Sequence, residues 1–458
     1  MKRSASYFLL RKNNKKYYKE LFLKKIKNVK TVGFDRVSSQ SFNKKIDDEI
    51  ALIIKNIHDG KYKFVAYKSK LLLKGKDKFP RQLSIPTIRD RLVLKMISEL
   101  LNDIFPEAKT ELPQIKIKSI SDVLTSNKFD SFIKIDIKNF YGTIPHGELL
   151  QVLKTRIRKK EILKLISSAL KNNTLEYANE RIEQNLKVGV PQGLSISNIL
   201  AEIYIRSCEA KLIGNGNYFI TRYVDDILIL CKDEDLQSII NNIVNALSDI
   251  SLAVHPFLGS SSKSSYGKIG VDSFVFLGYE FNYAKIAPRE NSIIKFETSL
   301  SSVIISFKYK YDECKNDEER ERCIAIFMWR LNLKISGCIY QGRRLGWVFY
   351  FSQTNTSTPF RRVDSTVRMI IKRLRLNFKI EPKKSLKAFY ESRCKDLNNR
   401  KYIVNLDSLT MLEKRTILSF YLPKAKVLNM SDEYVNVMFS KKIKDALKDL
   451  ERDVGGIS

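Results

Sequence analysis

The sequence predicts an α+β fold in which antiparallel strands precede a mainly helical C-terminal half. Residues 132–137 (FIKIDI) alternate as a buried strand does. Residues 219–231 (FITRYVDDILILC) place apolar runs on both sides of a polar centre, which is typical of a strand hairpin. Beyond residue 291 the apolar positions follow a mainly helical spacing.

Composition indicates a partner with many negative charges. The chain has 458 residues, and 82 Lys+Arg against 50 Asp+Glu give a formal net charge of +32. Such an excess attracts phosphate, so nucleic acid is the expected partner. A hydrophobic fraction of 43% excludes a disordered basic tail. The six cysteines form no C-x-x-C pair, so we expect reduced thiols rather than a zinc module or a disulfide framework.

No membrane segment is expected. No run approaches the roughly 18 consecutive apolar residues of a membrane span. The apolar run Tyr7–Leu10 is too short for a signal peptide. The sequence therefore predicts a cytoplasmic protein.

The first third of the chain is expected to alternate helices with exposed strands. Residues 1–30 hold eleven Lys/Arg and one acid among aromatic residues, which predicts a basic amphipathic helix or arm, with a solvated charged face as the alternative. The spacing predicts helices over 44–58 and 89–105, the second ending at Pro106. Residues 62–78 mix apolar residues with lysines, which predicts exposed strands joined by a turn at Gly75.

The rest of the chain carries further helical and β signals. We expect helices over 148–170, 197–212, 235–249, 361–378 and 432–453, and a β segment over 273–281. Ser431 is the predicted N-cap of the last helix. The aromatic run 347–351 (WVFYF) is expected to be a buried strand, with RNA contact as the alternative.

Three aspartates carry the chemical argument. Asp136 ends one predicted strand, while Asp225 and Asp226 lie at the tip of the hairpin. Successive strand residues point to opposite faces, so a turn must redirect one of the pair if both are to reach one site. Carboxylates this close repel one another unless divalent cations lie between them, and hard oxygen ligands select Mg²⁺. Two such ions can activate a primer 3′-hydroxyl and hold leaving pyrophosphate, which is polymerase chemistry.

Several motifs in a fixed order strengthen this interpretation, because two hairpin aspartates alone are more often turn residues. They are Gly33-Phe34-Asp35, RQLSIPTIRDR (81–91), KIDIKNFYGTIPH (134–146), GVPQGLSISNILAEIYI (189–205), RYVDDILIL (222–230) and FLGY (276–279). In this order the chain resembles bacterial reverse transcriptases. The resemblance implies a right-hand polymerase. Its expected parts are a basic N-terminal extension (1–30), fingers (31–130), a palm (131–290) that includes a returning fingers segment (about 150–190), and a helical thumb and C-terminal domain (291–458).

The resemblance also assigns roles at the site. It implies Asp136, Asp225 and Asp226 as catalytic metal ligands, with the backbone carbonyl of Ile137 beside them. Tyr141 is placed against the sugar of the incoming nucleotide, where a ring excludes the 2′-hydroxyl, and core packing is its alternative. The resemblance further implies that Arg81, Lys78 and Gln192 contact the nucleotide. It implies that the primer or template is contacted by Tyr223, Gly193, Leu277 and Gly278.

Alternatives stay open at several of these positions. Lys78 and its neighbours Lys74 and Lys76 are equally compatible with a solvated surface. The GVPQG segment is also compatible with a helix start, and Leu277 with the core. The family's proton-donating lysine has no clear counterpart, since the next lysines after LAVHP are Lys263 and Lys268.

The segment Gly342–Trp347 resembles defence-associated reverse transcriptases, the abortive-infection and unknown-group relatives. This implies antiphage defence with a structured noncoding RNA. The alternative is a retron-type or group II intron-derived enzyme, although neither an intron-type segment over 106–130 nor a maturase-like tail is evident. A catalytically vestigial RNA-binding protein is less favoured. The expected cofactors are two Mg²⁺ ions, with Mn²⁺ as a substitute. Expected partners are RNA, dNTPs and a DNA product, and a homo-oligomer stays open.

Overall fold

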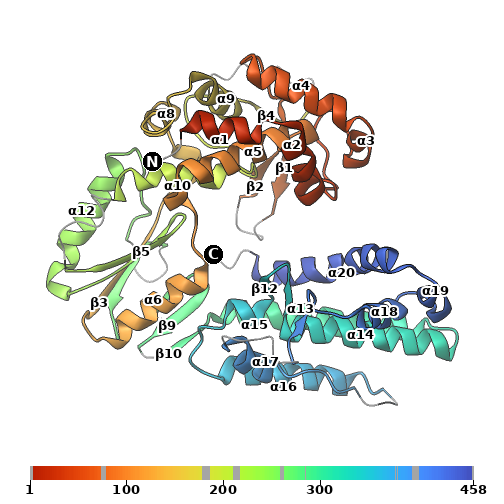
Figure 1. The fold of residues 1–458 in the computed structure, drawn as a ribbon. Coiled ribbons are helices and arrows are strands. Elements are labelled where there is room, and N and C mark those ends of the chain that lie inside the picture. Colours follow the sequence, from red (N-terminus) through yellow and green to blue (C-terminus); the bar gives the residue numbers. More distant parts are fainter. Residues whose placement is uncertain are drawn as a thin grey trace. The chain divides into compact units, whose positions relative to one another are not determined.

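The computed structural model describes residues 4–73, 79–177, 186–209, 217–257, 263–283, 285–376, 378, 380–394 and 402–455. The chain divides into two compact units (Figure 1). Unit 1 consists of Met1–Glu111 and Ser131–Tyr266, and unit 2 of Leu112–Asp130 and Gly267–Ser458. Residues 112–130 therefore belong to unit 2 although both flanking segments belong to unit 1.

The N-terminal residues of unit 1 form an amphipathic helical segment. The helices are α1 (Ala5–Lys12), α2 (Lys15–Leu21) and the π-helix η1 (Phe22–Ile26). Ser4 and Asn14 cap the first two with their side chains. Leu9, Tyr18 and Phe22 are buried. The basic segment is thus anchored to the core by its apolar face.

The strand β1 (Tyr67–Leu72) pairs antiparallel with β2 (Arg81–Ile85) and parallel with β4 (Thr174–Leu175). Of the strands expected within 62–78, the structure has β1 there, largely exposed, while its antiparallel partner β2 lies beyond that range. The predicted turn at Gly75 lies outside the described residues. The helices of this region are α3 (Ser39–Lys44), α4 (Ile46–His58), α5 (Ile88–Ile104), η2 (Pro106–Ala108), α8 (His146–Lys154) and α9 (Lys160–Leu170).

A second sheet of unit 1 carries the acidic motifs. Its order is β5-β6-β3-β7, formed by β5 (Phe219–Tyr223), β6 (Asp226–Cys231), β3 (Ser131–Asp136) and β7 (Ser265–Lys268). The β3–β6 and β5–β6 pairs are antiparallel. The helix α12 (Leu236–Ser248), which follows η3 (Asp233–Asp235), lies against this sheet (Figure 1). The helices α7 (Phe140–Thr143) and α10 (Ser197–Arg206) complete the region.

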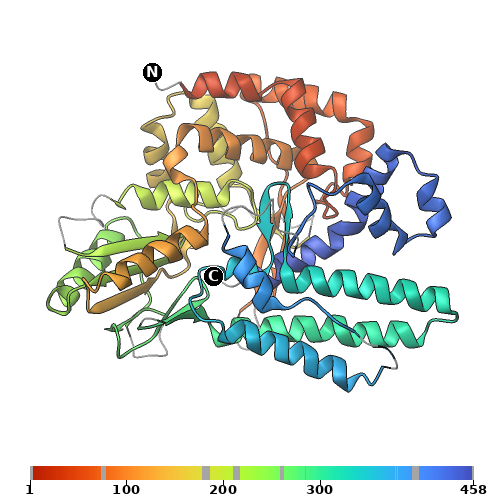
Figure 2. The same cartoon turned by 60° about the horizontal axis from the view of Figure 1, so that its bottom comes forward.

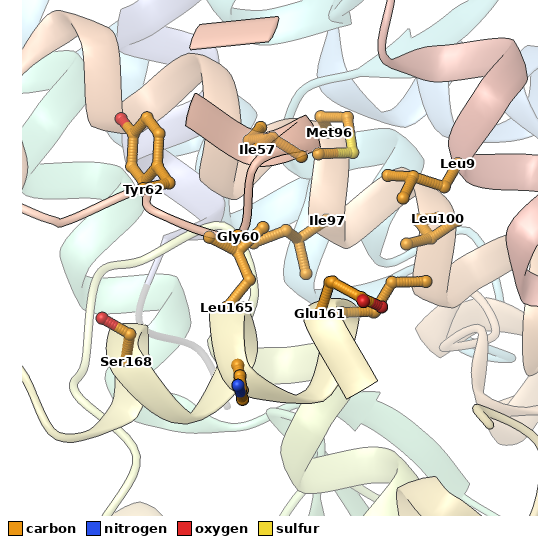
Figure 3. Close-up of a pocket in the computed structure, with 12 residues that line it drawn as sticks. Leu9, Ile57, Gly60, Tyr62, Met96, Ile97, Leu100, Glu161, Leu165 and Ser168 are labelled. Carbon is orange, nitrogen blue, oxygen red and sulfur yellow. The ribbon is translucent and has the colours of Figure 1, made fainter. Parts of the chain in front are cut away.

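A cavity of about 160 Å³ lies among the helices of unit 1 (Figure 3). Its lining is mostly apolar and comes from α1, α4, α5 and α9, and includes Leu9, Ile57, Met96, Leu100 and Leu165. None of the site residues expected from the sequence lines it.

Unit 2 is mainly helical. Its long helices α13 (Glu290–Asp312), α14 (Asp317–Ser336) and α16 (Thr358–Arg373) lie side by side (Figure 2). Its other helices are α6 (Pro113–Thr125), α15 (Trp347–Tyr350), α17 (Ser385–Ser392), α18 (Met411–Ser419), α19 (Lys424–Leu428) and α20 (Asp432–Val454). The strands are β8 (Phe274–Phe276), β9 (Tyr279–Asn282), β10 (Lys285–Pro288), β11 (Cys338–Tyr340), β12 (Arg343–Leu345) and β13 (Val404–Asn405).

The predicted α+β class, with an antiparallel sheet under the acidic motifs and a helical C-terminal region, is confirmed. Ser431 caps α20 as expected, because its hydroxyl accepts a bond from the Tyr434 N–H. The prediction of a strand over 347–351 was wrong: β12 ends at Leu345, Gly346 has φ 116°, and α15 follows. Trp347 is fully buried, and its ring stacks on that of Phe296 with the ring centres 4.6 Å apart. The prediction that this segment is buried was therefore right, and only the predicted strand conformation was wrong.

The six cysteines are free thiols. No helix within the described part of the chain is long and apolar enough to cross a membrane.

Candidate active site

The hairpin β5–β6 turns within two residues. Tyr223 is paired with Asp226, so Val224 and Asp225 form the connection. Val224 has φ 57°, a left-handed conformation that costs a non-glycine residue about 1 to 3 kcal/mol. The expected turn therefore separates the two acids: Asp225 lies in the turn and Asp226 begins β6.

Asp136 lies beside this turn. In the antiparallel register of β3 and β6 the Cα partner of Asp136 is Asp226. The next residue, Ile137, donates its backbone N–H to the carbonyl oxygen of Asp225 at 3.4 Å. Partners across an antiparallel pair have Cα atoms about 5 Å apart. The three acids, from segments some ninety residues apart in sequence, thus meet at one end of the sheet.

The acids influence one another electrically. Burial raises the pKa of Asp225, and the nearby charge of Asp136 raises it further. Arg81 and Lys263 act in the opposite direction on the same pKa. A cation placed between neighbouring carboxylates stabilises their ionised forms.

The donor set fits a hard divalent cation. Asp136 and Asp225 offer carboxylate oxygens close enough to couple electrostatically, which is the ligand type that Mg²⁺ prefers. Within the described ranges no three His, Cys, Asp or Glu side chains are gathered into a metal cage. The three acids are thus neighbours in the strand register, but in this structure their side chains are not gathered into a metal-binding group.

Asp136 also has a histidine and a lysine beside it, and the sequence did not predict these contacts. His255 Nε2 lies 3.2 Å and Lys263 Nζ 3.6 Å from Asp136 Oδ1. The Asp136 backbone N–H donates to Ser264 Oγ at 3.1 Å. Lys263, one of the two lysines that follow LAVHP, therefore lies beside Asp136.

Tyr141 stands near the acids on the short helix α7. Its hydroxyl donates to Asn198 Oδ1 on α10 at 2.9 Å. Burial raises the pKa of Tyr141 to about 12, and the charge of Asp225 adds to this effect. The ring is half-buried and packs against the hydrophobic core of unit 1.

Arg81 belongs to the small sheet formed by β2, β1 and β4. It is the first residue of β2 and is exposed. Its positive charge partly opposes the rise in pKa of both Asp225 and Tyr141. Lys78, the second expected cationic contact, lies outside the described residues.

The GVPQG segment connects β2 to the site. The Ser84 N–H donates to the Gln192 carbonyl at 2.7 Å, and Gly193 adopts φ 97°. A Cβ at Gly193 would lie 3.2 Å from the Ser84 oxygen, so glycine is required there. Gln192 Oε1 is buried, and no partner for it is found among the described residues. An amide oxygen without a partner suits a ligand-binding role.

A buried ion network lies directly behind the turn. Arg222, the residue before Tyr223, donates to Glu202 Oε1 and Oε2 at 3.0 and 2.8 Å and to Glu209 Oε1 at 2.7 Å. It also donates to the Val224 carbonyl at 3.1 Å. Burial lowers the pKa of Arg222, but the two glutamates more than offset this and leave it raised. Sequence reasoning missed this network, although Arg222 immediately precedes the motif.

The FLGY segment belongs to unit 2. Leu277 and Gly278 form the turn between β8 and β9, with φ 49° and 76°. The Leu277 side chain is buried, and its carbonyl accepts from the Tyr350 hydroxyl at 3.0 Å. Any primer contact at this turn would therefore come from its backbone.

Known proteins resemble part of the chain. Residues 73–281 match the family described as "Reverse transcriptase (RNA-dependent DNA polymerase)". The chain is 26% identical over 172 residues to the "Group II intron-encoded protein LtrA" of Lactococcus lactis subsp. cremoris, covering 36% of this chain and 28% of that protein. It is 25% identical over 165 residues to the "Putative COX1/OXI3 intron 2 protein" of Saccharomyces cerevisiae, covering 34% and 19%. The matches thus span less than a third of either relative.

Solved structures are also similar. One is a telomerase from Candida albicans in complex with a fragment of telomeric RNA, with 13% identity, a TM-score of 0.42 and coverage of 92% of this chain and 66% of that chain. Another is the apo telomerase from Candida tropicalis, with 14% identity, a TM-score of 0.41 and coverage of 88% and 72%. From the family match over the segment that holds the three acids, residues 73–281 are a reverse transcriptase domain.

Proposed function

We propose that the protein is an RNA-directed DNA polymerase that adds dNTPs to a primer end with divalent metal ions, Mg²⁺ or Mn²⁺ in its place. The observation that carries the proposal is the register of β3 and β6, which pairs Asp136 with Asp226 beside the turn that holds Asp225. A family match over the same segment supports it.

Each side chain at the site has a distinct task under this proposal. Asp136, Asp225 and Asp226 hold the metal ions, which when bound activate a 3′-hydroxyl and stabilise leaving pyrophosphate. Arg81 can donate paired hydrogen bonds to triphosphate oxygens. Tyr141 occupies the space that a 2′-hydroxyl would need. Lys263, 3.6 Å from Asp136, is a candidate source of the proton that pyrophosphate takes up.

The primer and template are RNA and DNA strands, and α16 offers a surface for them. Val363 and Val367 are buried on one face of this helix. On another face Arg361, Arg368 and Lys372 are exposed at intervals of seven and four residues, which aligns them along the helix. Such a stripe can follow the phosphates of a duplex.

For the biological role we propose antiphage defence with an associated structured RNA. The support is the resemblance of the segment Gly342–Trp347 to defence-associated reverse transcriptases. Gly342 and the preceding Gln341 form a tight turn held by Asp407, and Arg343 beside it is exposed. The alternative is an intron-derived or retron-type enzyme. The similarity to "Group II intron-encoded protein LtrA" favours this alternative as far as the polymerase domain extends.

One experiment tests both the polymerase activity and the biological role. The protein is purified from its host with its nucleic acid, the bound RNA is sequenced, and DNA made on addition of dNTPs and Mg²⁺ is sequenced and tested for covalent attachment to protein. DNA complementary to the bound RNA supports the polymerase. Intron RNA would decide for the alternative role, and the absence of any templated DNA would refute the proposal.

A further inference from the structure

Arg222 is tied to three groups at once. One of its terminal nitrogens donates to both Glu202 on α10 and the Val224 carbonyl in the acidic turn, at 3.0 and 3.1 Å. The other donates to Glu202 and Glu209 at 2.8 and 2.7 Å. One guanidinium therefore connects the catalytic turn to a helix.

The contact falls on the strained residue of the turn. Val224 has φ 57°, and a β-branched side chain has no intrinsic preference for that conformation. The carbonyl bonded by Arg222 belongs to the peptide that joins Val224 to Asp225. Its orientation therefore sets the direction in which Asp225 leaves the turn.

The network is rigid because it is buried and paired. The side chains of Arg222 and Glu202 are 9% and 6% exposed. A guanidinium bound by both oxygens of a carboxylate has a fixed plane and rotation. Arg206 completes the network by pairing with Glu209 at 3.2 Å, and among the described residues no contact of Arg206 with the turn is found.

The same helix also holds the aromatic residue of the site. Asn198 and Glu202 are four residues apart, so they share one face of α10. Asn198 accepts from Tyr141, while Glu202 accepts from Arg222. One face of α10 thus holds both the ring beside the incoming sugar and the turn that presents Asp225.

We infer that Arg222 is a positioning residue which, anchored on Glu202, fixes the Val224–Asp225 peptide so that Asp225 faces Asp136 and the pair can bind a divalent cation. The inference rests on the proposed function for the identity of the cation site. It predicts that Arg222 acts on metal binding and on turnover, although it touches neither metal nor substrate.

The test compares two conservative variants within one network. Arg222→Lys keeps the charge but loses the geometry that reaches two glutamates and the carbonyl. Arg206→Lys makes the same chemical change where no contact with the turn exists. Mn²⁺ binding to each purified full-length protein is measured by electron paramagnetic resonance without nucleotide, and kcat and KM for dNTP are measured separately. Thermal unfolding gives the cost to stability.

We expect Arg222→Lys to weaken Mn²⁺ binding by about 10- to 100-fold, the usual effect of losing a group that orients a metal ligand. We expect kcat to fall with little change in KM for dNTP, and Arg206→Lys to bind Mn²⁺ as the wild type does. Glu202→Gln, which leaves Arg222 in place but loosens its anchor, should weaken Mn²⁺ binding to a smaller extent.

Wild-type Mn²⁺ affinity in Arg222→Lys, or an equal loss in Arg206→Lys, would overturn the inference and leave only a structural ion network. The proposed function fails in a different way. If the wild type binds Mn²⁺, Asp225→Ala abolishes this binding and no dNTP is incorporated, the polymerase proposal is refuted while the positioning role of Arg222 stands on the binding data.

Discussion

Asp136 and Asp226 are direct partners in the antiparallel pair of β3 and β6, so a strand and a hairpin far apart in the chain present their acids at one edge. The adjacent bond from the Ile137 N–H to the Asp225 carbonyl continues this pairing into the turn. Backbone hydrogen bonds, rather than flexible side chains, thus bring the three acids together. A site built on paired strands is held more precisely than one built on loops.

Replacing both Asp225 and Asp226 with Ala should abolish dNTP incorporation and leave the fold intact. The reason is that β5, β6 and β3 pair through their backbones, which these substitutions leave in place. Primer extension on an RNA template measures activity, and circular dichroism measures folding. The expected loss is at least about 10³-fold, or about 4 kcal/mol in the barrier.

An adjacent pair of exposed acids in the same unit provides the control. Glu234 and Asp235 lie just beyond β6 and are exposed, so their double Ala variant removes the same charge from a neighbouring place. It should retain wild-type incorporation. Extension by the Asp225 and Asp226 double variant above background would reject these residues as metal ligands.

Tyr141 should determine the choice between deoxyribonucleotides and ribonucleotides. Tyr141→Ala removes the ring, and we expect the ratio of kcat/KM for dNTP over rNTP to fall by at least about tenfold. Tyr141→Phe keeps the ring and loses only the bond to Asn198, so its ratio should stay near that of the wild type. Discrimination that is unchanged in Tyr141→Ala, or lost equally in Tyr141→Phe, would reject a steric role for the ring.

The sequence was most informative where periodicity and local signals agree. Alternation in residues 132–137 and 219–231 predicted β3 and the β5–β6 hairpin, and the helix signals near 44–58 and 89–105 correspond to α4 and α5. In these segments the spacing of apolar residues agrees with the side chains that the fold buries. The capping serine of α20 is a local signal of the same kind.

What the sequence could not give depends on tertiary contacts. Trp347 to Tyr350 are as apolar as a buried strand, but Gly346 with φ 116° changes the chain direction and a helix buries the same rings. The bonds of Arg222 to Glu202 and Glu209 join residues 20 and 13 positions apart and leave no periodic pattern. The contacts of His255 and Lys263 with Asp136 depend in the same way on how the loop after α12 returns to β3.

The stripe on α16 should contribute to the salt dependence of nucleic-acid binding. Arg368 and Lys372 are exposed, and each phosphate contact adds roughly 0.7 to 0.9 to the slope of log K against log salt. Replacing both with Gln should therefore lower the magnitude of the slope by about 1.4 to 1.8. Fluorescence anisotropy of a labelled RNA–DNA duplex, titrated at several salt concentrations, measures this slope.

Two exposed lysines of α19 provide a matched control for that measurement. Lys424→Gln with Lys426→Gln removes the same charge from another helix of unit 2. If this variant lowers the slope as much as the α16 variant does, binding responds to net charge and not to the α16 surface.

The last prediction concerns stability and rests on Asp90 in α5. Its carboxylate is 1% exposed and accepts from the Tyr62 hydroxyl at 2.8 Å and from the Val65 N–H at 3.1 Å. Burial nevertheless raises the pKa of Asp90 from 3.8 to about 6. Asp90 thus connects α5 to the segment that leads into β1. Its burial makes the ionised form of the carboxyl group less stable in the folded protein.

The sign of the pH effect follows from proton binding. Between pH 3.8 and about 6 the folded state binds the Asp90 proton more tightly than the unfolded state does. The contribution of Asp90 to the free energy of unfolding is therefore largest below this window, declines as pH rises through it, and is constant above it. A shift of this size corresponds to at most about 3 kcal/mol.

Asp90→Asn cannot ionise, so it should lack this decline while losing the bond from the Val65 N–H at every pH. Urea unfolding of both proteins at intervals from pH 4 to pH 7.5 gives the difference in their free energies of unfolding. That difference should shrink as pH rises to about 6 and then stay constant. Tyr62→Phe removes a bond that favours the ionised carboxylate, so it should extend the window to higher pH. A difference that does not vary between pH 4 and pH 6 would mean that Asp90 remains ionised throughout, held by its two hydrogen bonds against the effect of burial.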